Sequence, residues 1–554
     1  MKFSRRVNYL LLSFLFGLNI AIRYPTVQHE IGVDSFVIHI LTNSIIEYQY
    51  GKWLLHPLSY IGLYPLSYPS AYPFLAAGVS SSSGIDVELS ILIISVVLGL
   101  VGVFSTYFLA REIKNDDLFC FIAAVAFSLS PIFIKTTYWQ ASTRNLFMAL
   151  APACILLLLK TRGFSINRVN ILFIITLLTV GTSHRLGVFM IFILIAYLTA
   201  VLLYALHKQL VPLFAKSKRT KHSVRIGMVS LISAIFIGLL VMLVSGNNPL
   251  QGAEGLGIYE ETAIITGSES HILILNLFIS LIGRIGFMLI FGFLGFAYLI
   301  WKRNKTLYDV FLLVSLVFIF PTIGMRTYSS YFFLIFFSLL AGLFFLYCAK
   351  LLKRRKQVIL VLLVIGLVGS VSFYGYMFDH WKVSSGSMAE LTYDTGLYVR
   401  YNTHNTFITN DGLLAARVGA TSGKSCLPIG GGTLHSNGPE QLIYDFLHEE
   451  DFQIIPIPPS QIAVGSDALY KAKGTGNAEQ EWVSIHSMKC NEIPSNKIIQ
   501  YNLQYSVSYK KWPTQIYAYN KLYKSNFLIS IHLERYKIYD NGEIEIHYFE
   551  YVPP

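Results

Sequence analysis

The 554-residue chain is poor in charge and in cysteine. Only 13% of its residues are charged, whereas 54% are hydrophobic, and a soluble globular domain does not show this balance because so much apolar side chain cannot all be buried. Its five cysteines form no metal-binding framework. Internal repeats and low-complexity tracts are also missing. These absences indicate a protein whose apolar surface faces lipid.

The chain also lacks the phosphate-cradling loop of ATP-binding proteins. Residues 418–426, VGATSGKSC, come nearest to it. Only three residues lie between Gly419 and Gly423, however, where the motif has four. This segment is therefore excluded as a nucleotide site.

Long apolar runs dominate what is present. A membrane-spanning helix needs about 20 apolar residues, and two of the runs, 7–22 and 169–183, only approach that length. The first run follows MKFSRR as a signal peptide would, but no small-residue cleavage site comes after it, which favours an uncleaved anchor. We predict an α-helical polytopic membrane protein with about 11 transmembrane helices, from runs at 7–22, 89–110, 118–134, 145–160, 169–183, 186–206, 226–245, 272–301, 306–323, 329–349 and 357–377.

The net charge of +12 is placed in short loops between these runs. With the N-terminus in the cytoplasm, every basic cluster falls on the cytoplasmic side, as the positive-inside rule requires. We therefore predict a multi-pass protein of the plasma membrane with a cytoplasmic N-terminus and an extracytoplasmic C-terminal domain, and no nucleic-acid partner. The clusters are Arg5-Arg6, Lys160 to Arg168, Lys208 to Arg225, Lys302 to Lys305 and Lys350 to Lys356.

This topology divides the chain into a membrane domain, residues 1–377, and an extracytoplasmic soluble domain of mixed α/β type, residues 378–554. The soluble domain contains strand-like alternation and ends in a hairpin around Asn541-Gly542. Cys426 and Cys490 lie in it and are candidates for a disulfide.

Two long loops of the membrane domain also lie on the outer face. Loop 23–88 is expected to hold an amphipathic helix near residues 35–50. The stretch YPLSYPSAYP follows it, and its prolines predict an extended path. Loop 246–271 is rich in glycine and acidic residues and is expected to be mobile.

The segment GVDSFVIHILTNSIIEYQYGKW, which follows the first run, resembles the first outer loop of the GT-C superfamily of multi-span glycosyltransferases. In that family the loop supplies an acid that serves as base or metal ligand, and Asp34 matches it. His39 falls where a histidine is common in the oligosaccharyltransferase branch. Gly32 argues against a helix that would place Glu30 and Asp34 on one face. The alternative for Asp34 is a solvated loop acid or a helix cap.

A second resemblance lies in GMRTYSSYFFLIFFSLLAG, residues 324–342. It looks like the oligosaccharyltransferase segment that holds an arginine against the carrier phosphate, and Arg326 is the matching residue; the alternative is a boundary arginine that binds lipid head groups. Glu269, in TGSES, lies where the family keeps an acid on a mobile outer loop, although Glu260 and Glu261 compete for that role.

The departures from the family pattern bear on metal use. Oligosaccharyltransferases carry a pair of metal-binding carboxylates where this chain has PIFIKTTYWQASTRNLF. A hard divalent cation would lose its anionic ligands there. Lys135 or Arg144 are placed to neutralise a phosphate instead, so a metal-independent mechanism is favoured and no cofactor is assigned. The WWDYG motif that reads the acceptor is also missing; Asp411 stands near its expected start, but no tryptophan does.

Together these features favour an enzyme, a membrane glycosyltransferase that moves a sugar from a polyprenyl-phosphate-linked donor to a glycan, lipid or protein acceptor at the outer face. Asp34 is the predicted catalytic residue, and Arg326, Lys135 and Arg144 are the predicted contacts of the donor phosphate. His39, His184 in GTSHRLG and Glu269 are possible auxiliary groups.

Two alternatives stay open. One is a divergent oligosaccharyltransferase. The other is a transporter or lipid flippase, although few ionisable residues lie deep in the apolar runs, as transport requires. Arg284 is the exception.

Overall fold

The computed structural model describes part of the chain at the level of individual residues. The described ranges are 3–51, 54–55, 63–64, 70–161, 167–214, 281–320, 326–352, 364, 366, 387–403, 407–409, 412–424, 426–428, 453–456, 470–473, 505–510 and 533–551. The predicted runs 226–245 and 357–377 lie wholly or almost wholly outside them, as do loop 246–271 with Glu269, the side chain of Cys426 and all of Cys490.

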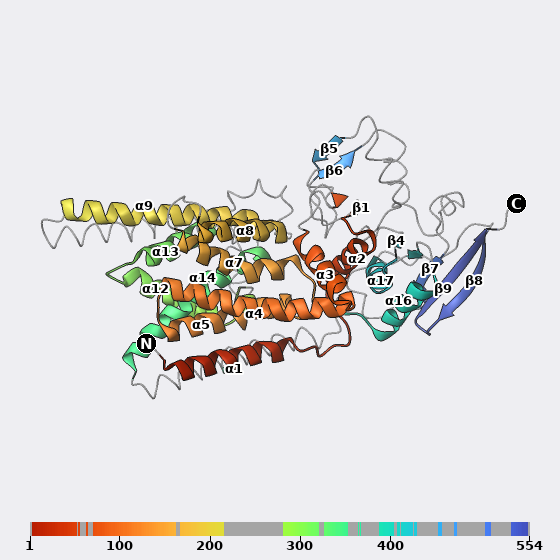
Figure 1. Ribbon diagram of the computed structural model, residues 1–554, viewed down its shortest axis with the longest axis horizontal. Helices are drawn as coiled ribbons and strands as arrows, with labels where there is room; N and C mark the ends of the chain where they lie inside the picture. The colour runs from red at the N-terminus through yellow and green to blue at the C-terminus, as the bar shows by residue number, and fades with distance from the viewer. Residues whose placement is uncertain are drawn as a thin grey trace, which may run out of the picture.

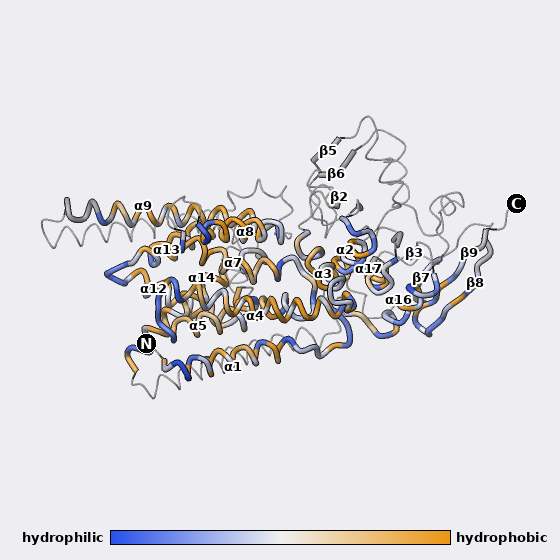
Figure 2. The backbone as a smooth tube through the Cα atoms, viewed as in Figure 1, coloured by the Kyte–Doolittle hydropathy of each residue, from blue (hydrophilic) through white to orange (hydrophobic). Residues whose placement is uncertain are grey.

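Nine of the described helices lie side by side in an elongated bundle (Figure 1). They are strongly apolar along most of their length (Figure 2). The bundle consists of α1 (Arg5–Arg23), α4 (Val87–Ile113), α5 (Asp117–Ser128), α7 (Thr143–Lys160), α8 (Arg168–Ser183), α9 (Met190–Phe214), α12 (Met288–Trp301), α13 (Leu307–Ile319) and α14 (Arg326–Leu351).

Within the described ranges, four stretches of helix are long and apolar enough to cross a bilayer: Val87–Ile113, Thr143–Lys160, Leu186–Leu206 and Ser329–Leu351. Four more helices in the described part, α5, α8, α12 and α13, are apolar but shorter. The protein is thus a helical membrane protein. The total of about 11 spans stays a prediction.

Local sequence signals set where these helices begin. Asp86 caps α4 by accepting a hydrogen bond from the backbone N–H of Glu88, and Ser142 caps α7 in the same way. At α13, Thr306 and Asp309 form a reciprocal capping box. Short polar side chains therefore mark the point at which these three apolar helices begin.

Two of the predicted spans, 118–134 and 272–301, are not single continuous helices, and the prediction of one helix for each was wrong. The first stops at Ser128 and restarts as α6 (Pro131–Thr136), because a proline has no N–H to continue a helix but is well suited to begin one. The second is interrupted at Gly286, whose φ of +86° is open mainly to glycine, and α12 begins at Met288. A Cβ at Gly286 would lie 3.3 Å from Cδ of Pro131, so the two interruptions meet.

One end of the bundle gathers the loops that carry basic residues, and we call it the basic end. Burial lowers the pKa of Lys114, and the nearby ammonium groups of Lys350 and Lys302 lower it further. At the same end, the phenol of Tyr308 in the first turn of α13 donates to Glu112 in the last turn of α4, at 3.0 Å. The sequence prediction that these loops share a side is consistent with this arrangement.

The opposite end, which we call the α2 end, carries α2 (Val33–Tyr48), α3 (Ala71–Ser83) and the short strands β1 (Leu54–Leu55) and β2 (Leu63–Tyr64) (Figure 1). The helix predicted near residues 35–50 is present as α2, but the prediction that it is amphipathic was wrong. Every residue from Ser35 to Thr42 is buried, so this part of α2 has no exposed polar face. The prediction of an extended path through YPLSYPSAYP was wrong for its last three residues, which begin α3. Pro73 lies in the first turn of α3, where its missing N–H has no helical partner to lose.

The C-terminal region contributes two helices, α16 (Glu390–Asn402) and α17 (Gly412–Ser422), and a five-stranded sheet in the order β4-β3-β7-β9-β8. β3 pairs in parallel with both β4 and β7, and the remaining pairs are antiparallel. The β8–β9 hairpin turns at Asn541-Gly542 as predicted. The sheet strands are β3 (Phe407–Thr409), β4 (Cys426–Pro428), β7 (Tyr505–Tyr509), β8 (Leu533–Asp540) and β9 (Ile544–Tyr551); β5 (Gln453–Pro456) and β6 (Tyr470–Lys473) form a separate pair.

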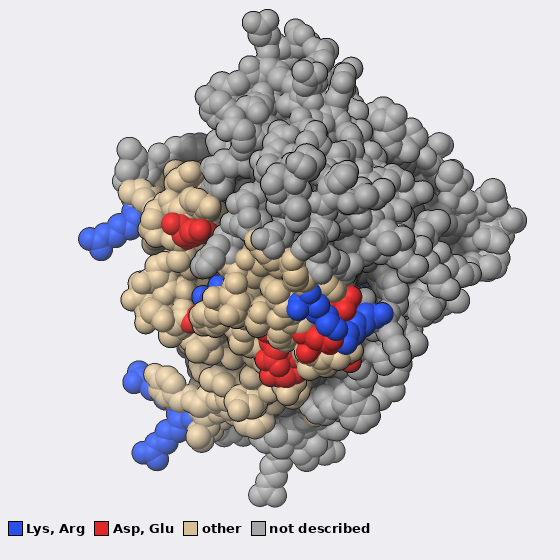
Figure 3. All heavy atoms as spheres, turned by 90° about the vertical axis from the view of Figure 1, so that its right-hand side faces the viewer, with Lys and Arg blue, Asp and Glu red and all other residues tan. Residues whose placement is uncertain are grey.

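This C-terminal region packs directly on α2. Ala416 and Ala420 of α17 form an apolar cluster with Phe36 and Ile40 of α2, and the Asn43 amide donates to the carbonyl of Ala420 at 2.8 Å. Viewed from this end, one group of described acidic and basic side chains stands close together near the centre of the face, while other basic side chains project at its left edge (Figure 3). The first outer loop is therefore held between the bundle and the C-terminal region.

Candidate functional site

The site begins with a glycine at the N-terminus of α2. Gly32 has a φ of +99°, and a Cβ at this position would lie 2.3 Å from Nε2 of Gln140. Any other residue would be strained both in its backbone and by this contact. The sharp turn leaves Glu30 outside α2 and puts Asp34 in its first turn, where the helix dipole favours a carboxylate. The prediction that Glu30 and Asp34 do not share a helix is confirmed.

Asp34 forms an ion pair with Arg144. Its Oδ2 lies 3.2 Å from Nη2 of Arg144, and both side chains are 32% exposed. Arg144 is the second residue of α7, so both partners stand at helix N-termini. A partly exposed pair of this kind adds only about 0–1 kcal/mol to stability. Fold stability alone therefore gives little reason for placing the two groups together, and about a third of each side chain is exposed to solvent.

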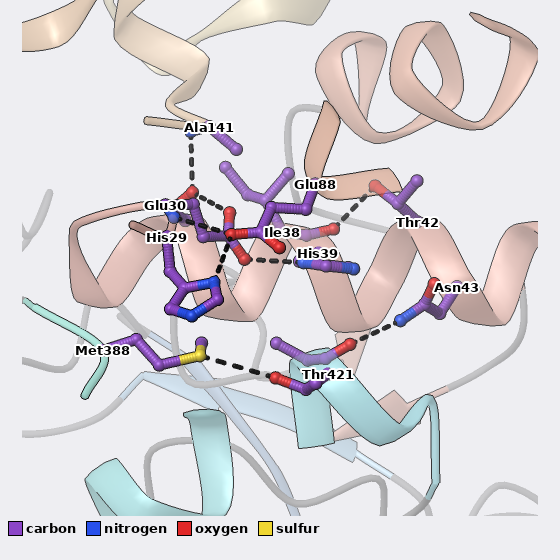
Figure 4. A network of polar contacts seen from close by, with 12 residues as sticks. His29, Glu30, Ile38, His39, Thr42, Asn43, Glu88, Ala141, Met388 and Thr421 are labelled. Atoms are coloured by element: carbon purple, nitrogen blue, oxygen red, sulfur yellow. Dashed lines mark hydrogen bonds and ion pairs between the residues drawn. The ribbon is translucent and has the colours of Figure 1, made fainter. Parts of the chain in front are cut away.

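A buried acid lies directly behind this pair. Glu30 is completely buried and accepts hydrogen bonds from the Ser35 hydroxyl at 2.5 Å and from Nδ1 of His39 at 2.6 Å. Its backbone N–H donates to Glu88 at 2.9 Å (Figure 4). Burial alone would lower the pKa of His39, but the Glu30 carboxylate outweighs it and the pKa is raised. Glu30 and His39 thus form an internal ion pair without access to substrate.

A second histidine joins three parts of the chain. His29 lies between two carboxylates, with Nδ1 3.2 Å from Glu88 and Nε2 2.9 Å from Glu390 of α16, and its ring stacks on Tyr393 at 3.9 Å. Burial would lower the pKa of His29, but Glu88 and Glu390 raise it above its usual value. We call this contact the His29 clasp, because it ties the first outer loop and α4 to the C-terminal region.

The segment between α6 and α7 closes over this loop. Trp139 has a φ of +29°, which is rare for a bulky residue and indicates local strain. Its carbonyl accepts from the N–H of Ile31 at 3.1 Å, and its indole N–H donates to the carbonyl of Glu88 at 3.1 Å. Two segments more than 100 residues apart in sequence are thereby locked together.

The other predicted residues are distributed as follows. Lys135 is exposed in the last turn of α6. His184 is buried and its Nδ1 accepts from the N–H of Leu186, so it caps the turn of the 3-10 helix η1 (Arg185–Phe189). Arg326 is the first residue of α14, and its side chain lies outside the description, as does Glu269.

Glu88 and Glu390 were not singled out from the sequence. The signal available for Glu88 was its position two residues after the N-cap Asp86, at the start of a long apolar run on the predicted outer side. Nothing in the sequence around Glu390 indicates a histidine partner that lies 361 positions earlier.

The described residues do not fit a divalent cation. Such ions prefer several carboxylate or carbonyl oxygens, and no group of three or more His, Cys, Asp or Glu side chains within the described part could hold one. Asp34 faces a guanidinium instead, and both oxygens of Glu30 are taken by Ser35 and His39.

No family model and no curated relative match this sequence. Among solved structures, the oligosaccharyltransferase of Archaeoglobus fulgidus in the apo form superimposes with a TM-score of 0.53 at 12% identity, over 91% of this chain and 70% of that one. The same enzyme, AglB, in complex with an inhibitory peptide and a dolichol-phosphate gives 0.52 at 13% identity, over 91% and 69%. ArnT from Cupriavidus metallidurans bound to undecaprenyl phosphate matches over 98% and 97% with a TM-score of 0.40 at 11% identity.

Identities this low establish a common fold and leave the activity open. The likeness nevertheless covers about nine-tenths of the chain. The sequence resemblance is confirmed at the level of the fold: this chain shares the fold of the oligosaccharyltransferase of Archaeoglobus fulgidus.

Proposed function

We propose that this protein is a membrane glycosyltransferase that moves a sugar from a polyprenyl-phosphate-linked donor to an acceptor hydroxyl at the α2 end. The observation that carries the proposal is the Asp34–Arg144 pair, in which a carboxylate and a guanidinium stand 3.2 Å apart and partly exposed. The fold supports it, because AglB, which shares this fold, was solved with a dolichol-phosphate bound.

The two charged groups suit the two ends of a nucleophilic displacement at the anomeric carbon, with Asp34 at the attacking acceptor and Arg144 at the leaving phosphate. The Asp34 carboxylate takes the proton of the acceptor hydroxyl as that oxygen attacks the anomeric carbon of the donor sugar. The bond from this carbon to the phosphate oxygen breaks, and its electron pair leaves on the polyprenyl phosphate. Arg144, with Lys135 and Arg326, supplies the fixed cations that stabilise the charge on the departing phosphate. This mechanism needs no metal.

The carrier chain needs an apolar path that begins near these cations. Lys350 lies at the basic end, so Arg326 at the other end of the same helix lies towards the α2 end. Phe333 follows seven residues later, about 10 Å along the helix axis. It borders an entirely apolar hollow between α12, α13 and α14, lined by Leu281, Leu289, Phe293, Phe296, Leu316, Phe320, Phe333 and Phe337. We assign this hollow to the polyprenyl chain.

The C-terminal region is placed to influence the acceptor. Its helix α17 packs on α2, and Glu390 of α16 reaches His29, three residues before the turn at Gly32 that positions Asp34. We propose that residues 378–554 form an extracytoplasmic domain that presents or selects a glycan, lipid or protein acceptor, and that loop 246–271 with Glu269 closes over the donor.

The decisive experiment is a transfer assay with the purified full-length protein in detergent. Donors are dolichyl- and undecaprenyl-phosphate carrying mannose or glucose, and acceptors are methyl glycosides, a lipid extract and a sequon peptide. Asp34→Asn keeps the size of the side chain but removes the base, so the rate should fall by about 10²–10⁴-fold. Near-normal turnover by Asp34→Asn, or no turnover of any donor by the native protein, would refute the proposal.

Asp86→Asn is the matched control. Asp86 is also an acid at a helix N-terminus of the α2 end and pairs with an arginine, Arg400, at 3.5 Å, and both side chains are about half exposed. Asparagine caps helices as well as aspartate does. The control variant should therefore fold and keep its activity.

A divergent oligosaccharyltransferase is the nearest alternative, since the TM-scores above 0.5 are to AglB. The sequon peptide in the acceptor panel tests it. If that peptide alone is glycosylated, and only from a donor that carries a whole glycan, this alternative replaces transfer of a single sugar.

A lipid flippase is a second candidate, favoured by the two interrupted helices that meet at Gly286 and Pro131. Interrupted helices inside a bundle are typical of transporters. Nη1 of Arg284 is moreover buried there without a hydrogen-bond partner in the described part. Reconstitution in liposomes with a fluorescent polyprenyl phosphate distinguishes the two functions, because a transferase should leave the rate of transbilayer movement unchanged.

A further inference from the structure

The hydroxyl of Ser35 connects the two halves of the candidate site. It donates to Oε2 of Glu30 at 2.5 Å and accepts from the backbone N–H of Ala141 at 2.8 Å (Figure 4). Ser35 is the residue after Asp34, and Ala141 stands three residues before Arg144. The bridge therefore crosses between the same two segments as the Asp34–Arg144 pair, only one position away from the acid.

Glu30 is itself held from several directions. Its backbone N–H is tied to Glu88 of α4, and its second carboxylate oxygen is tied to His39, which lies on α2 beyond Ser35. A buried carboxylate with a protonated histidine beside it is costly to displace, because removal of one partner leaves an unpaired buried charge. Glu30 is thus a fixed point from which Ser35 is oriented.

Neither residue can meet a substrate. Glu30 and Ser35 are both fully buried, in contrast to the one-third exposure of Asp34 and Arg144 in front of them. The positive φ angle of Trp139 lies two residues before Ala141 in the same bridge, so this segment is held in a conformation that a tryptophan does not adopt by local preference. Such a conformation persists only where surrounding contacts determine it.

We propose that Glu30 and Ser35 are positioning residues, whose hydrogen bonds to each other and to Ala141 hold the Asp34 carboxylate in register with Arg144. This inference rests on the proposed function, in which Asp34 is the base. Displacement of a catalytic group by about 1 Å can cost on the order of 10²-fold in rate. A loss of register should thus reduce kcat, whereas donor binding, which in the proposed function also uses Lys135, Arg326 and the apolar hollow, should change little.

The test measures kcat and the donor KM per folded molecule with the donor and acceptor that give turnover in the panel above. Ser35→Ala removes the bridge and should lower kcat by about 10–100-fold with less than a twofold change in KM. Ser35→Thr keeps the hydroxyl and should restore most of the lost kcat. A change in KM alone, or an unaltered kcat in Ser35→Ala, would overturn the inference.

Ser105→Ala is the matched structural control. Ser105 is also a buried serine that joins two segments, since its hydroxyl on α4 contacts the carbonyl of Ala149 in α7 at 3.0 Å. This variant should lose a similar amount of thermal stability and keep its kcat. An equal fall in kcat for Ser105→Ala and Ser35→Ala would show a general effect of weaker packing and refute the positioning role.

Two further variants complete the design. If Ser35→Ala cannot be purified, Glu30→Gln tests the positioning role instead, because it keeps the shape of the side chain but loses the charge that orders His39. A severalfold lower kcat supports the inference, and an unchanged kcat refutes it.

Asp34→Asn separates the positioning role from the proposed function. If it is inactive while Ser35→Ala is fully active, only the positioning role fails, whereas an active Asp34→Asn removes the proposed function itself.

Discussion

The His29 clasp should make the attachment of the C-terminal region depend on pH. When His29 is protonated, its two ring N–H groups donate to Glu88 and Glu390. A hydrogen bond between charged groups contributes about 1.5–3 kcal/mol when buried. The Glu390 side chain is 52% exposed, so its bond is reduced to about 0–1 kcal/mol. His29→Phe keeps the stacking on Tyr393 and should lose about 2–4 kcal/mol at pH 6.

The direction of the pH effect follows from the raised pKa. A histidine whose pKa is higher in the folded protein contributes its full stabilisation below the unfolded value of about 6.5, and this contribution is lost as the pH rises through the folded value. The slope in that window is at most about 1.4 kcal/mol per pH unit for one proton. His39 acts in the same direction, so the native protein should lose stability between pH 6 and pH 9, and His29→Phe should lose less.

The measurement is thermal unfolding in detergent at pH 6 and pH 9. The loss of stability caused by His29→Phe should be largest at pH 6, and the difference from the native protein should narrow at pH 9. Tyr393→Phe is the control, because it keeps the stacked ring and both carboxylates. If the native protein and His29→Phe show the same pH dependence, the clasp does not bind a proton on folding and the reasoning is wrong.

Three other predictions concern single positions. Gly32→Ala places a side chain at a positive φ and against Gln140, so it should lower the free energy of unfolding by about 1–3 kcal/mol and remove much of the transfer rate. Gly84→Ala is the control, because Gly84 also has a positive φ but no atom within 4 Å, and it should keep the transfer rate. Equal losses of transfer rate in the two variants would contradict the site geometry. Arg326→Lys keeps the charge but not the planar fork and should raise the donor KM severalfold with little change in kcat; an unchanged KM would remove Arg326 from the donor site. Enzymatic reporters should read outside when fused after residue 380 and inside at residue 218, and an outside reading at 218 would place Asp34 in the cytoplasm.

The sequence predicted the features that depend on neighbouring residues. The apolar runs that fall within the described residues, the hairpin at Asn541-Gly542 and the absence of a helix across Gly32 are local patterns, and each appears in the structure. The interruptions of the two spans were not predicted, because hydropathy contains no information about backbone geometry. Pro131 and Gly286 are short gaps in otherwise apolar sequence.

The candidate site was predicted as separate residues, not as an arrangement. Asp34 and Arg144 were both candidates, but a pair of charges 110 positions apart leaves no trace in a single sequence. His39 was assigned beside the acid, whereas the fold turns it inward to Glu30. Which of several nearby polar groups becomes buried is decided by packing against α4, α7 and α17, and this is tertiary information.

Helix α5 has a consequence for how the protein is made. Every residue from Leu118 to Ser128 is buried, whereas α8 has only Val180 and Ser183 buried, so the more hydrophobic helix is the one that lipid does not touch. With 12 residues, α5 is about 18 Å long, too short to insert alone into a hydrocarbon core of about 30 Å. Part of its enclosure comes from α14, where a Cβ at Gly342 would lie 2.9 Å from the Phe119 ring. Because α14 is synthesised some 200 residues later, α5 must first be held in the translocation machinery or against α4. The bundle can therefore be completed only after α14 has entered the membrane.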